Sequence, residues 1–406
     1  MPEKINYSAY MAIKPHFDML ARLGYCKVIK KDLSPLKRRL HKCYRIVVWL
    51  FVFVYNLQHI LRIVQMRHST EQVVNTLFIL LTTLNTLAKH LTFNIKSQRV
   101  DNIIDVINGP LFAPTEIYHV EKMKENALTM FRILKLYLSG VVVCALLWVI
   151  FPVVNRAMGE EVHFTGYIPF DTSQSPTFEL CVAYMNAVVG FQGLGNVTMD
   201  CTIVACYAQA MVQFQILKYN LELRHLIKPS DIEDSALNGK RLLFIDENIA
   251  VRENIKRRLI RNVLHQQKIN WFVKEIEYIF VQAMLFQFFV VSWVICMTVY
   301  KIVGLSLLSA EFVSMAMYLC CMLAQFFIYC YYGTQVMYQS EFLNQSIYCS
   351  SWLSLSPKFR KHILVMMENC KQPVIPRTAY ILPISLQSYI AVLRASYTLF
   401  TFLDRK

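Results

Sequence analysis

Seven apolar segments constrain this fold most, because each is close to the length that a helix needs to cross a membrane. A hydrocarbon core about 30 Å thick requires about 20 helical residues. We therefore predict an all-α membrane protein with seven transmembrane helices. The apolar runs lie near residues 46–61, 72–88, 136–155, 180–217, 278–300, 312–340 and 378–393.

The basic residues between these runs are distributed unequally. When the connecting segments are assigned alternately to two sides, one side carries 30 Lys and Arg residues and the other carries 5. Lys and Arg are enriched in cytoplasmic loops of membrane proteins. We therefore expect a cytoplasmic N-terminus and an extracellular C-terminus, which is the reverse of a seven-span G-protein-coupled receptor.

The composition agrees with an integral membrane protein, since 55% of the residues are hydrophobic and 17% are charged. The net charge of +15 alone is compatible with nucleic-acid binding. However, the basic clusters Lys37-Arg38-Arg39 and Lys256-Arg257-Arg258 lie close to predicted spans. That position favours contact with anionic lipid of the inner leaflet, and we expect no nucleic-acid partner.

The fourth apolar run, from Leu180 to Leu217, is nearly two spans long. Two spans here would place the basic segment 218–274 outside the cell, so we predict one long helix that projects into the cytoplasm. Asp200 is the only charged residue of the run. It is expected either near the inner interface or buried in a polar contact, because an isolated carboxylate is costly within a membrane.

The segment 218–274 has one clear break, at Lys228-Pro229-Ser230-Asp231, followed by sequence compatible with a helix. Glu253 and Arg257 are four residues apart and can pair on a solvated helix. We expect this helix to form a cytosolic layer against the inner ends of the fourth and fifth spans. The apolar face predicted to make this contact consists of Ile255, Leu259, Ile260 and Val263.

Sequence patterns for catalysis are missing from the chain. It contains no His-Glu-x-x-His pattern and no phosphate-binding Walker loop, and its histidines lack the spacing of a metal site. We therefore expect no enzymatic activity, no catalytic residue, no metal and no cofactor.

The last sixty residues are the most specific part of the sequence. Tyr348 and Trp352 precede a basic step, Pro357-Lys-Phe-Arg-Lys361, and an apolar helix that ends in Met366-Met367. Gln372-Pro373 follows, and the final span closes on Ser396-Tyr397-Thr398-Leu399-Phe400. This combination resembles the signature region of insect odorant receptors. The length, the inverted topology and the loop before the fifth span extend the resemblance over the whole chain.

The resemblance implies a heteromeric, odorant-gated, nonselective cation channel in the plasma membrane of olfactory sensory neurons. The partners that it implies are co-receptor subunits in a heterotetramer and a small volatile organic ligand. This chain lacks the long insertion of the co-receptor before the fifth span. Its ending, Phe402-Leu-Asp-Arg-Lys406, is charged where the co-receptor is apolar. The resemblance is therefore to the odorant-tuned subunit.

Two alternatives stay open at this stage. Gustatory receptors share the inverted topology but typically close with Thr-Tyr, five apolar residues and Gln-Phe, whereas residues 396–404 of this chain differ from that pattern. A metabotropic receptor or a transporter is the alternative from a different class. The predicted orientation disfavours the first, and the lack of paired interrupted spans disfavours the second.

We divide the chain into four parts. Residues 1–42 form an N-terminal cytoplasmic segment, and residues 43–335 contain spans one to six, including the cytoplasmic loop 218–274. Residues 336–375 form a cytoplasmic helix and a break, and residues 376–406 form a last span that lines the pore. Three prolines, Pro373, Pro376 and Pro383, are expected to interrupt the seventh element. A cytoplasmic amphipathic helix near 341–370 then precedes a separate span near 378–403.

The predicted last span is too polar to face lipid on all sides. Its polar residues can be buried against other helices of the same subunit, or they can line a central pore shared by several subunits. The resemblance favours the pore, with the gate near the C-terminus. It places Thr398 and Phe402 on the pore-facing stripe and Arg405 or Lys406 at the mouth. The polar residues of this span are Ser385, Gln387, Ser388, Arg394, Ser396, Thr398 and Thr401.

The odorant site is expected to be an apolar cavity with few polar groups, because volatile molecules offer mainly apolar surface. The resemblance places it among the outer halves of spans two, three, four and six. Tyr184 and Tyr318 are the candidates for orienting an ester, aldehyde or alcohol oxygen, and Met185 and Met315 for an adaptable shape. The full candidate set is Phe78, Leu81, Leu146, Trp148, Phe151, Tyr184, Met185, Val188, Met315, Tyr318 and Met322, with Trp293 and Met297 on span five.

Overall fold

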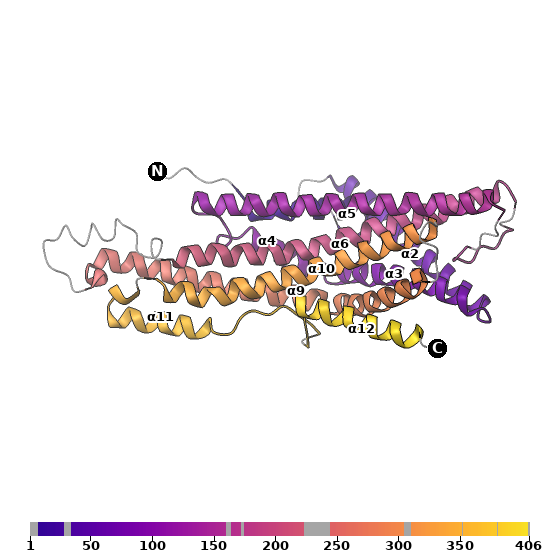
Figure 1. Ribbon diagram of the computed structural model, residues 1–406. Helices are drawn as coiled ribbons and strands as arrows, with labels where there is room; N and C mark the ends of the chain where they lie inside the picture. Colours follow the sequence, from indigo (N-terminus) through magenta and orange to yellow (C-terminus); the bar gives the residue numbers. More distant parts are fainter. Residues whose placement is uncertain are drawn as a thin grey trace.

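The computed structural model describes residues 7–27, 34–159, 164–171, 174–222, 244–303, 310–350, 352–379 and 381–404. It is a bundle of long helices that run side by side along one axis (Figure 1). Its helices are α1 Lys14–Arg22, α2 Pro35–Gln65, α3 Thr70–Ile95, α4 Ser97–Ile107, α5 Ile117–Ala157, α6 Thr177–Leu221, α9 Ile249–Val303, α10 Ala310–Tyr348, α11 Pro357–Asn369 and α12 Leu386–Asp404. Short 3-10 turns are η1 Ala9–Ala12, η2 Ile245–Glu247 and η3 Trp352–Ser354.

The outer surface of the bundle carries the apolar side chains expected next to lipid. By length and hydropathy, five of the described helices are able to cross a membrane, namely α2, α5, α6, α9 and α10. Large apolar residues are exposed along α2 and α5, among them Leu50, Phe53 and Ile150. Extended apolar surface of this kind is rare on soluble monomers, so the surface fits a bilayer.

The fourth apolar run forms one uninterrupted helix, as predicted. α6 holds 45 residues, which corresponds to about 68 Å at 1.5 Å per residue. A bilayer core of about 30 Å accounts for less than half of that length. The rest of α6 therefore extends beyond the membrane. The second half of the helix, from Thr198 to Leu217, is almost completely buried by other elements.

α9 combines two predicted elements. The helix predicted in the second part of the segment 218–274 continues without a break into the fifth membrane span, and together they form one helix of 55 residues. Ile255 and Leu259 are buried on its inner face, but Ile260 is 48% exposed, so the prediction for Ile260 was wrong. Consecutive helical residues point about 100° apart, and Leu259 and Ile260 cannot share a narrow stripe. The predicted break at 228–231 lies outside the described residues.

The charged pair predicted on this helix differs in the structure. Glu253 Oε1 lies 3.4 Å from Lys256 Nζ, one turn along the helix, in place of the predicted Arg257 partner. Arg257 instead donates to Asn254 Oδ1 at 3.3 Å. Both contacts are exposed, and such pairs contribute little to stability.

The prolines interrupt the seventh element as predicted, but its two helices begin later than predicted. Residues 341–348 belong to α10, and the separate helix α11 starts at Pro357, a position that tolerates proline because the first helical N–H groups have no partner in the helix. The last helix starts at Leu386 because 377–383 form a small antiparallel hairpin of β1 Arg377–Thr378 and β2 Leu382–Pro383.

The main core lies at one end of the bundle. It joins η1, α1, α4, α11, the second half of α6 and the first half of α9. His16 on α1 is fully buried there, and this burial lowers its pKa to about 4, so the side chain is neutral at cellular pH. Figure 1 places α11 toward this end and α12 toward the other. The well-packed end therefore supports a less densely packed half in which the candidate site lies.

Candidate functional site

A cavity of about 130 Å³ lies between α3, α5, α6 and α10 in the less densely packed half. These are the second, third, fourth and sixth predicted spans, which is where the site was expected. The cavity is lined by Thr82, Thr83, Asn85, Thr86, Val141, Cys144, Ala145, Trp148, Val189, Gly190, Gln192, Gly193, Asn196, Val197, Tyr318, Cys321, Met322 and Gln325.

Three of the predicted ligand residues, Trp148, Tyr318 and Met322, line this cavity. The rings of Trp148 and Tyr318 are nearly parallel, with centroids 6.2 Å apart. Phe78 packs directly behind, with its ring centroid 4.9 Å from that of Tyr318, and Leu81 packs against the same apolar cluster. These residues form one wall of the cavity and the layer behind it.

A second group of predicted residues, Tyr184, Met185 and Val188, lies in a separate apolar cluster with Tyr55. The Tyr184 hydroxyl donates to Gln58 Oε1 at 3.0 Å. It is therefore engaged with α2 and does not line the described cavity. Val188 directly precedes Val189, the first cavity-lining residue of α6, whereas Tyr184 and Met185 precede Val189 by about one helical turn.

The remaining predicted residues are not brought into this cavity. Leu146 is 58% exposed on the outside of α5. Trp293 and Met297 are half-buried on α9, and Met315 is half-buried on α10. The Phe151 side chain lies outside the described residues.

Polar residues of the cavity wall are the part that the sequence prediction missed. Asn85, Gln192, Asn196 and Gln325 all line the cavity. The available signal was that each is an amide side chain within a predicted apolar span, where polar groups usually face the interior of the bundle. Only Asp200 was singled out on that ground.

Asp200 forms the centre of a buried polar network beside the cavity. The side chain is 3% exposed and forms an ion pair with Lys89, which is 1% exposed on α3. Tyr329 donates its hydroxyl hydrogen to Asp200 Oδ1 at 2.6 Å, and Gln325 donates to the other carboxylate oxygen. The network joins α3, α6 and α10, so of the two expectations for Asp200 the buried polar contact is confirmed.

Lys89 also connects this network to the cavity wall. Its Nζ atom donates to Asn196 Oδ1 at 2.8 Å, and Asn196 lines the cavity one turn before Asp200 on α6. An ion pair within a membrane is tolerated when both charges are paired and hydrogen-bonded. The cavity therefore borders charges that are already paired and presents neutral polar groups.

The polar residues of α12 divide between two faces. Ser385 and Ser396 are buried, and Ser388 donates to the Pro383 carbonyl oxygen at 2.6 Å. Together with Tyr389, Val392 and Leu393, they face the rest of the chain, where α12 packs on α9 and α10. Internal packing, one of the two earlier alternatives, therefore accounts for the polar residues of this face.

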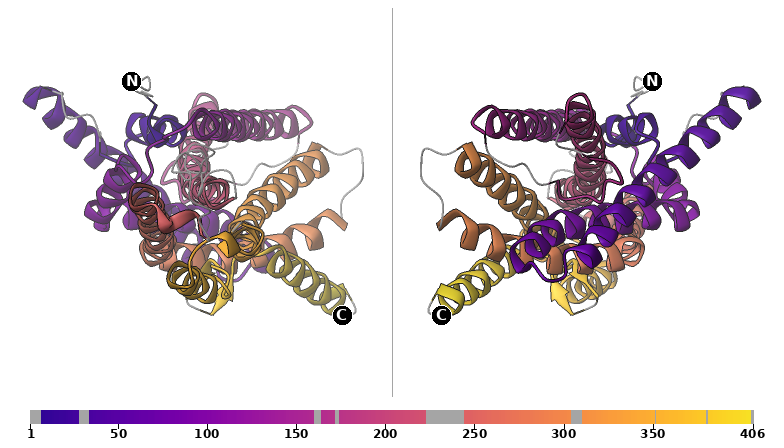
Figure 2. Two further views of the ribbon diagram at one scale, coloured as in Figure 1. Left: turned by 90° about the vertical axis from the view of Figure 1, so that its left-hand side faces the viewer. Right: turned by 90° about the vertical axis from the view of Figure 1, so that its right-hand side faces the viewer.

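The opposite face of α12 carries Gln387, Arg394 and Thr398, all exposed and spaced so that they share one stripe. Thr401, half-buried, continues the stripe, and its hydroxyl donates to the Thr398 carbonyl oxygen at 2.9 Å. The end-on views show α12 at the periphery of the single chain (Figure 2). The Phe402 side chain and residues Arg405 and Lys406 lie outside the described residues.

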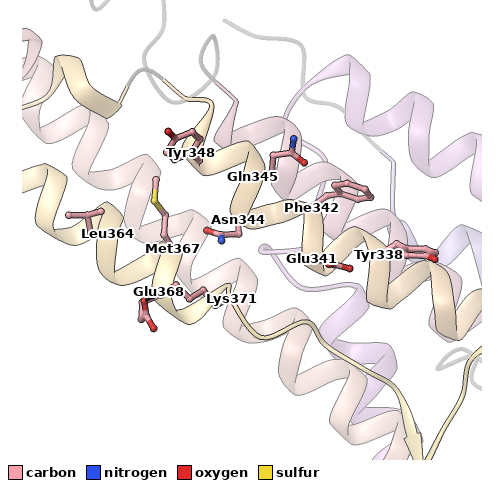
Figure 3. A pocket seen from close by; sticks show the side chains of 10 residues that line it. All are labelled: Tyr338, Glu341, Phe342, Asn344, Gln345, Tyr348, Leu364, Met367, Glu368 and Lys371. Carbon is pink, nitrogen blue, oxygen red and sulfur yellow. Dashed lines mark ion pairs between the residues drawn. The ribbon is translucent and has the colours of Figure 1, made fainter.

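A larger cavity of about 680 Å³ lies between the far end of α10 and α11 (Figure 3). Its lining includes Glu341, Glu368 and Lys371, and the last two form an exposed ion pair at 2.5 Å. This cavity lies at the well-packed end and contains none of the predicted ligand residues. Its charged, open lining makes it a poor site for a small apolar molecule.

These features together define a multi-pass helical membrane protein with a small cavity between four helices and a last helix that exposes polar side chains. A sequence profile described as 7tm Odorant receptor matches residues 69–397. The chain belongs to the odorant receptor family.

Curated relatives from Drosophila melanogaster agree with this assignment. Odorant receptor 46a, isoform B, is 23% identical over 375 residues, which covers 89% of this chain and 88% of that receptor. Odorant receptor 94a is 23% identical over a match that covers 60% of this chain and only 58% of its own length. Odorant receptor 23a is 33% identical over 24% of its length.

Solved structures share the fold over nearly the whole chain. The insect olfactory receptor OR5 from Machilis hrabei superposes with a TM-score of 0.79 at 16% identity, covering 96% of this chain and 97% of that one. The same receptor in complex with eugenol gives a TM-score of 0.77 at 17% identity, with 97% coverage of both chains. The likeness confirms the predicted all-α fold with seven membrane helices.

Proposed function

We propose that this chain is the odorant-binding subunit of a heteromeric, ligand-gated, nonselective cation channel, and that it is not an enzyme. The observation that carries the proposal is membership of the odorant receptor family over residues 69–397. The cavity between α3, α5, α6 and α10 and the exposed polar face of α12 support the proposal, because such a subunit needs a ligand site and a pore surface.

The proposed ligand is a small volatile organic molecule bound in the cavity beside Trp148, Tyr318 and Met322. A protein with the same fold has been solved in complex with eugenol, which supports a ligand of this kind. Phe78 and Leu81 support the aromatic wall from behind. Tyr184, Met185 and Val188 form a second apolar cluster, which we propose as an entrance or accessory site.

The proposed partner is the odorant co-receptor, in a heterotetramer. Arg394 and the neighbouring polar residues of α12 are unsuited to lipid, since a charged side chain inside a bilayer is costly. Four such helices around a central axis would place this stripe against water. The charged C-terminal residues Arg405 and Lys406 oppose cation entry if every subunit carries them, which favours a mixture with co-receptor subunits.

In this arrangement the N-terminus is cytoplasmic, the C-terminus is extracellular, and the complex lies in the plasma membrane of olfactory sensory neurons. Ligand binding favours the open pore by stabilising an outward position of α12, which widens the pore at the level of Phe402. Such coupling requires the ligand to bind the open state more tightly than the closed state. α10 provides the physical connection, because it contributes to the cavity and also packs on α12.

Coexpression tests the proposal. Cells that contain this chain and an odorant co-receptor should show a cation current during application of an odorant panel, with G-protein signalling blocked. Cells that contain this chain without the co-receptor should show no such current. A second-messenger response without current would instead identify a metabotropic receptor, and accumulation of the ligand without current would identify a transporter.

A further inference from the structure

Gln192 is a buried amide that lines the cavity without a partner. The side chain is 1% exposed, and neither its Nε2 nor its Oε1 atom has a hydrogen-bond partner among the residues that the structure describes. More than nine-tenths of buried polar groups in proteins are paired, so an orphan amide requires an explanation. Its position on the wall of a cavity between four helices indicates that a bound molecule completes its hydrogen bonds.

Other polar groups of the same wall already have partners. Thr83 donates to Asn56 Oδ1 at 2.9 Å, and Asn196 Oδ1 accepts from Lys89. Gln325 donates to Asp200, which in turn is paired with Lys89. Asn85 donates through Nδ2 to Gln287, which leaves its own Oδ1 without a partner in the described part of the chain. The Tyr318 hydroxyl on α10 also lines the cavity and has no partner in the described part of the chain. The free capacity therefore comprises the Gln192 amide, the Asn85 Oδ1 atom and the Tyr318 hydroxyl, on α6, α3 and α10.

This capacity selects a chemical class. An ester or ketone has only acceptor oxygens and would leave Gln192 Oε1 unpaired, and a hydrocarbon would leave both atoms unpaired. A hydroxyl group can accept from Gln192 Nε2 and can donate to Gln192 Oε1 or Asn85 Oδ1. The neighbouring charges Lys89 and Asp200 already neutralise each other, so the cavity offers no counter-ion to a charged ligand.

The size of the cavity limits the rest of the molecule. A dry cavity of about 150 Å³ accommodates benzene, and this cavity of 130 Å³ is close to that size. Trp148, Tyr318 and Met322 provide the apolar wall for a compact ring or a short chain. We propose that the cavity selects a compact neutral alcohol or phenol of about six or seven non-hydrogen atoms, with Gln192 as the residue that recognises the hydroxyl group.

This inference rests on the proposed function and refines its ligand class. The probes are cyclohexanol, cyclohexanone and methylcyclohexane, which have nearly the same shape and differ in hydrogen bonding. In the complex of this chain with the co-receptor, we expect cyclohexanol to reach half-maximal current at a lower concentration than cyclohexanone or methylcyclohexane. Each matched hydrogen bond should contribute about ten-fold in apparent affinity.

Gln192→Met keeps the length of the side chain and removes the amide. We expect this variant to require at least about ten-fold more cyclohexanol for half-maximal current, while its response to methylcyclohexane stays the same or improves. The unchanged hydrocarbon response shows that the variant is folded and gated. Gln209→Met is the matched control, because Gln209 is a fully buried amide further along α6 and outside the cavity lining; it should keep the preference for cyclohexanol.

Thermal unfolding of the purified complex, with and without each probe, measures binding independently of conduction. Stabilisation by cyclohexanol that is lost in Gln192→Met supports the inference even if no current flows, in which case only the channel proposal fails. Equal responses and equal stabilisation by cyclohexanol and methylcyclohexane in the native complex would overturn the inference. Cyclohexanol selectivity that persists in Gln192→Met would overturn the role of Gln192.

Discussion

Replacing Lys89 with methionine is expected to remove most of the folded receptor from the membrane. The substitution leaves the Asp200 carboxylate buried with only Tyr329 and Gln325 as partners. Loss of one partner of a buried ion pair typically costs about 3–5 kcal/mol, because the remaining charge stays out of water. That cost is a large fraction of the stability of a typical domain. Surface labelling of intact cells and the unfolding temperature in detergent measure the effect.

A second substitution separates this mechanism from a simple packing defect. Asp200→Asn in the Lys89→Met background removes the orphan charge, so it should restore most of the surface expression. Asp200→Asn alone leaves Lys89 without its counter-ion and should also destabilise the protein. If the loss of stability in the double variant equals the sum of the losses in the two single variants, the ion pair is not the source of the stability.

Reversing the charge of Arg394 is expected to increase the cation current through the heteromer several-fold. Arg394 lies on the exposed stripe of α12. At about 8 Å from a permeating ion, one unit charge changes the energy of that ion by about 0.5–2 kcal/mol, depending on the local water content. Arg394→Glu changes the side-chain charge by two units and replaces repulsion of cations by attraction. Single-channel conductance and the cation-to-anion permeability ratio report the change.

The control for this prediction is Arg132→Glu, which changes the net charge equally on the exposed part of α5. We expect normal conductance from it, because α5 carries no part of the proposed pore stripe. Equal conductance of Arg394→Glu and the native subunit, at equal surface expression, would place Arg394 outside the pore.

The helical architecture was predictable because hydropathy and charge act over whole segments. The long fourth helix followed from one argument, that two spans would move a basic loop to the wrong side of the membrane. The starts of α11 and α12 were not predictable to better than several residues. The hairpin at 377–383 is fixed by tertiary contacts, such as the Arg377 amide donating to Glu277 Oε1 at 2.7 Å on α9, which local sequence does not reveal.

The cavity was predictable in position and less so in detail. Trp148, Tyr318 and Met322 followed from the choice of helices, whereas Tyr184 lies about one turn before the first cavity-lining residue of α6 and donates its hydroxyl hydrogen to Gln58 on α2. Gln192 was missed because a polar residue in an apolar helix can face a partner, a cavity or a neighbouring subunit. Only the packing of four helices shows that it lines a cavity without a partner.

The most direct test of the central claim, that α12 of this chain lines the pore of an odorant-gated heteromer, is covalent modification of Thr398→Cys during the odorant response. A positively charged thiol reagent, applied from outside the cell, should reduce the evoked current irreversibly until a reductant is added. The native subunit, whose exposed thiols among the described residues are Cys43, Cys320 and Cys349, none of them on α12, should show no such loss. Complete labelling of the new cysteine with an unchanged current would contradict the account.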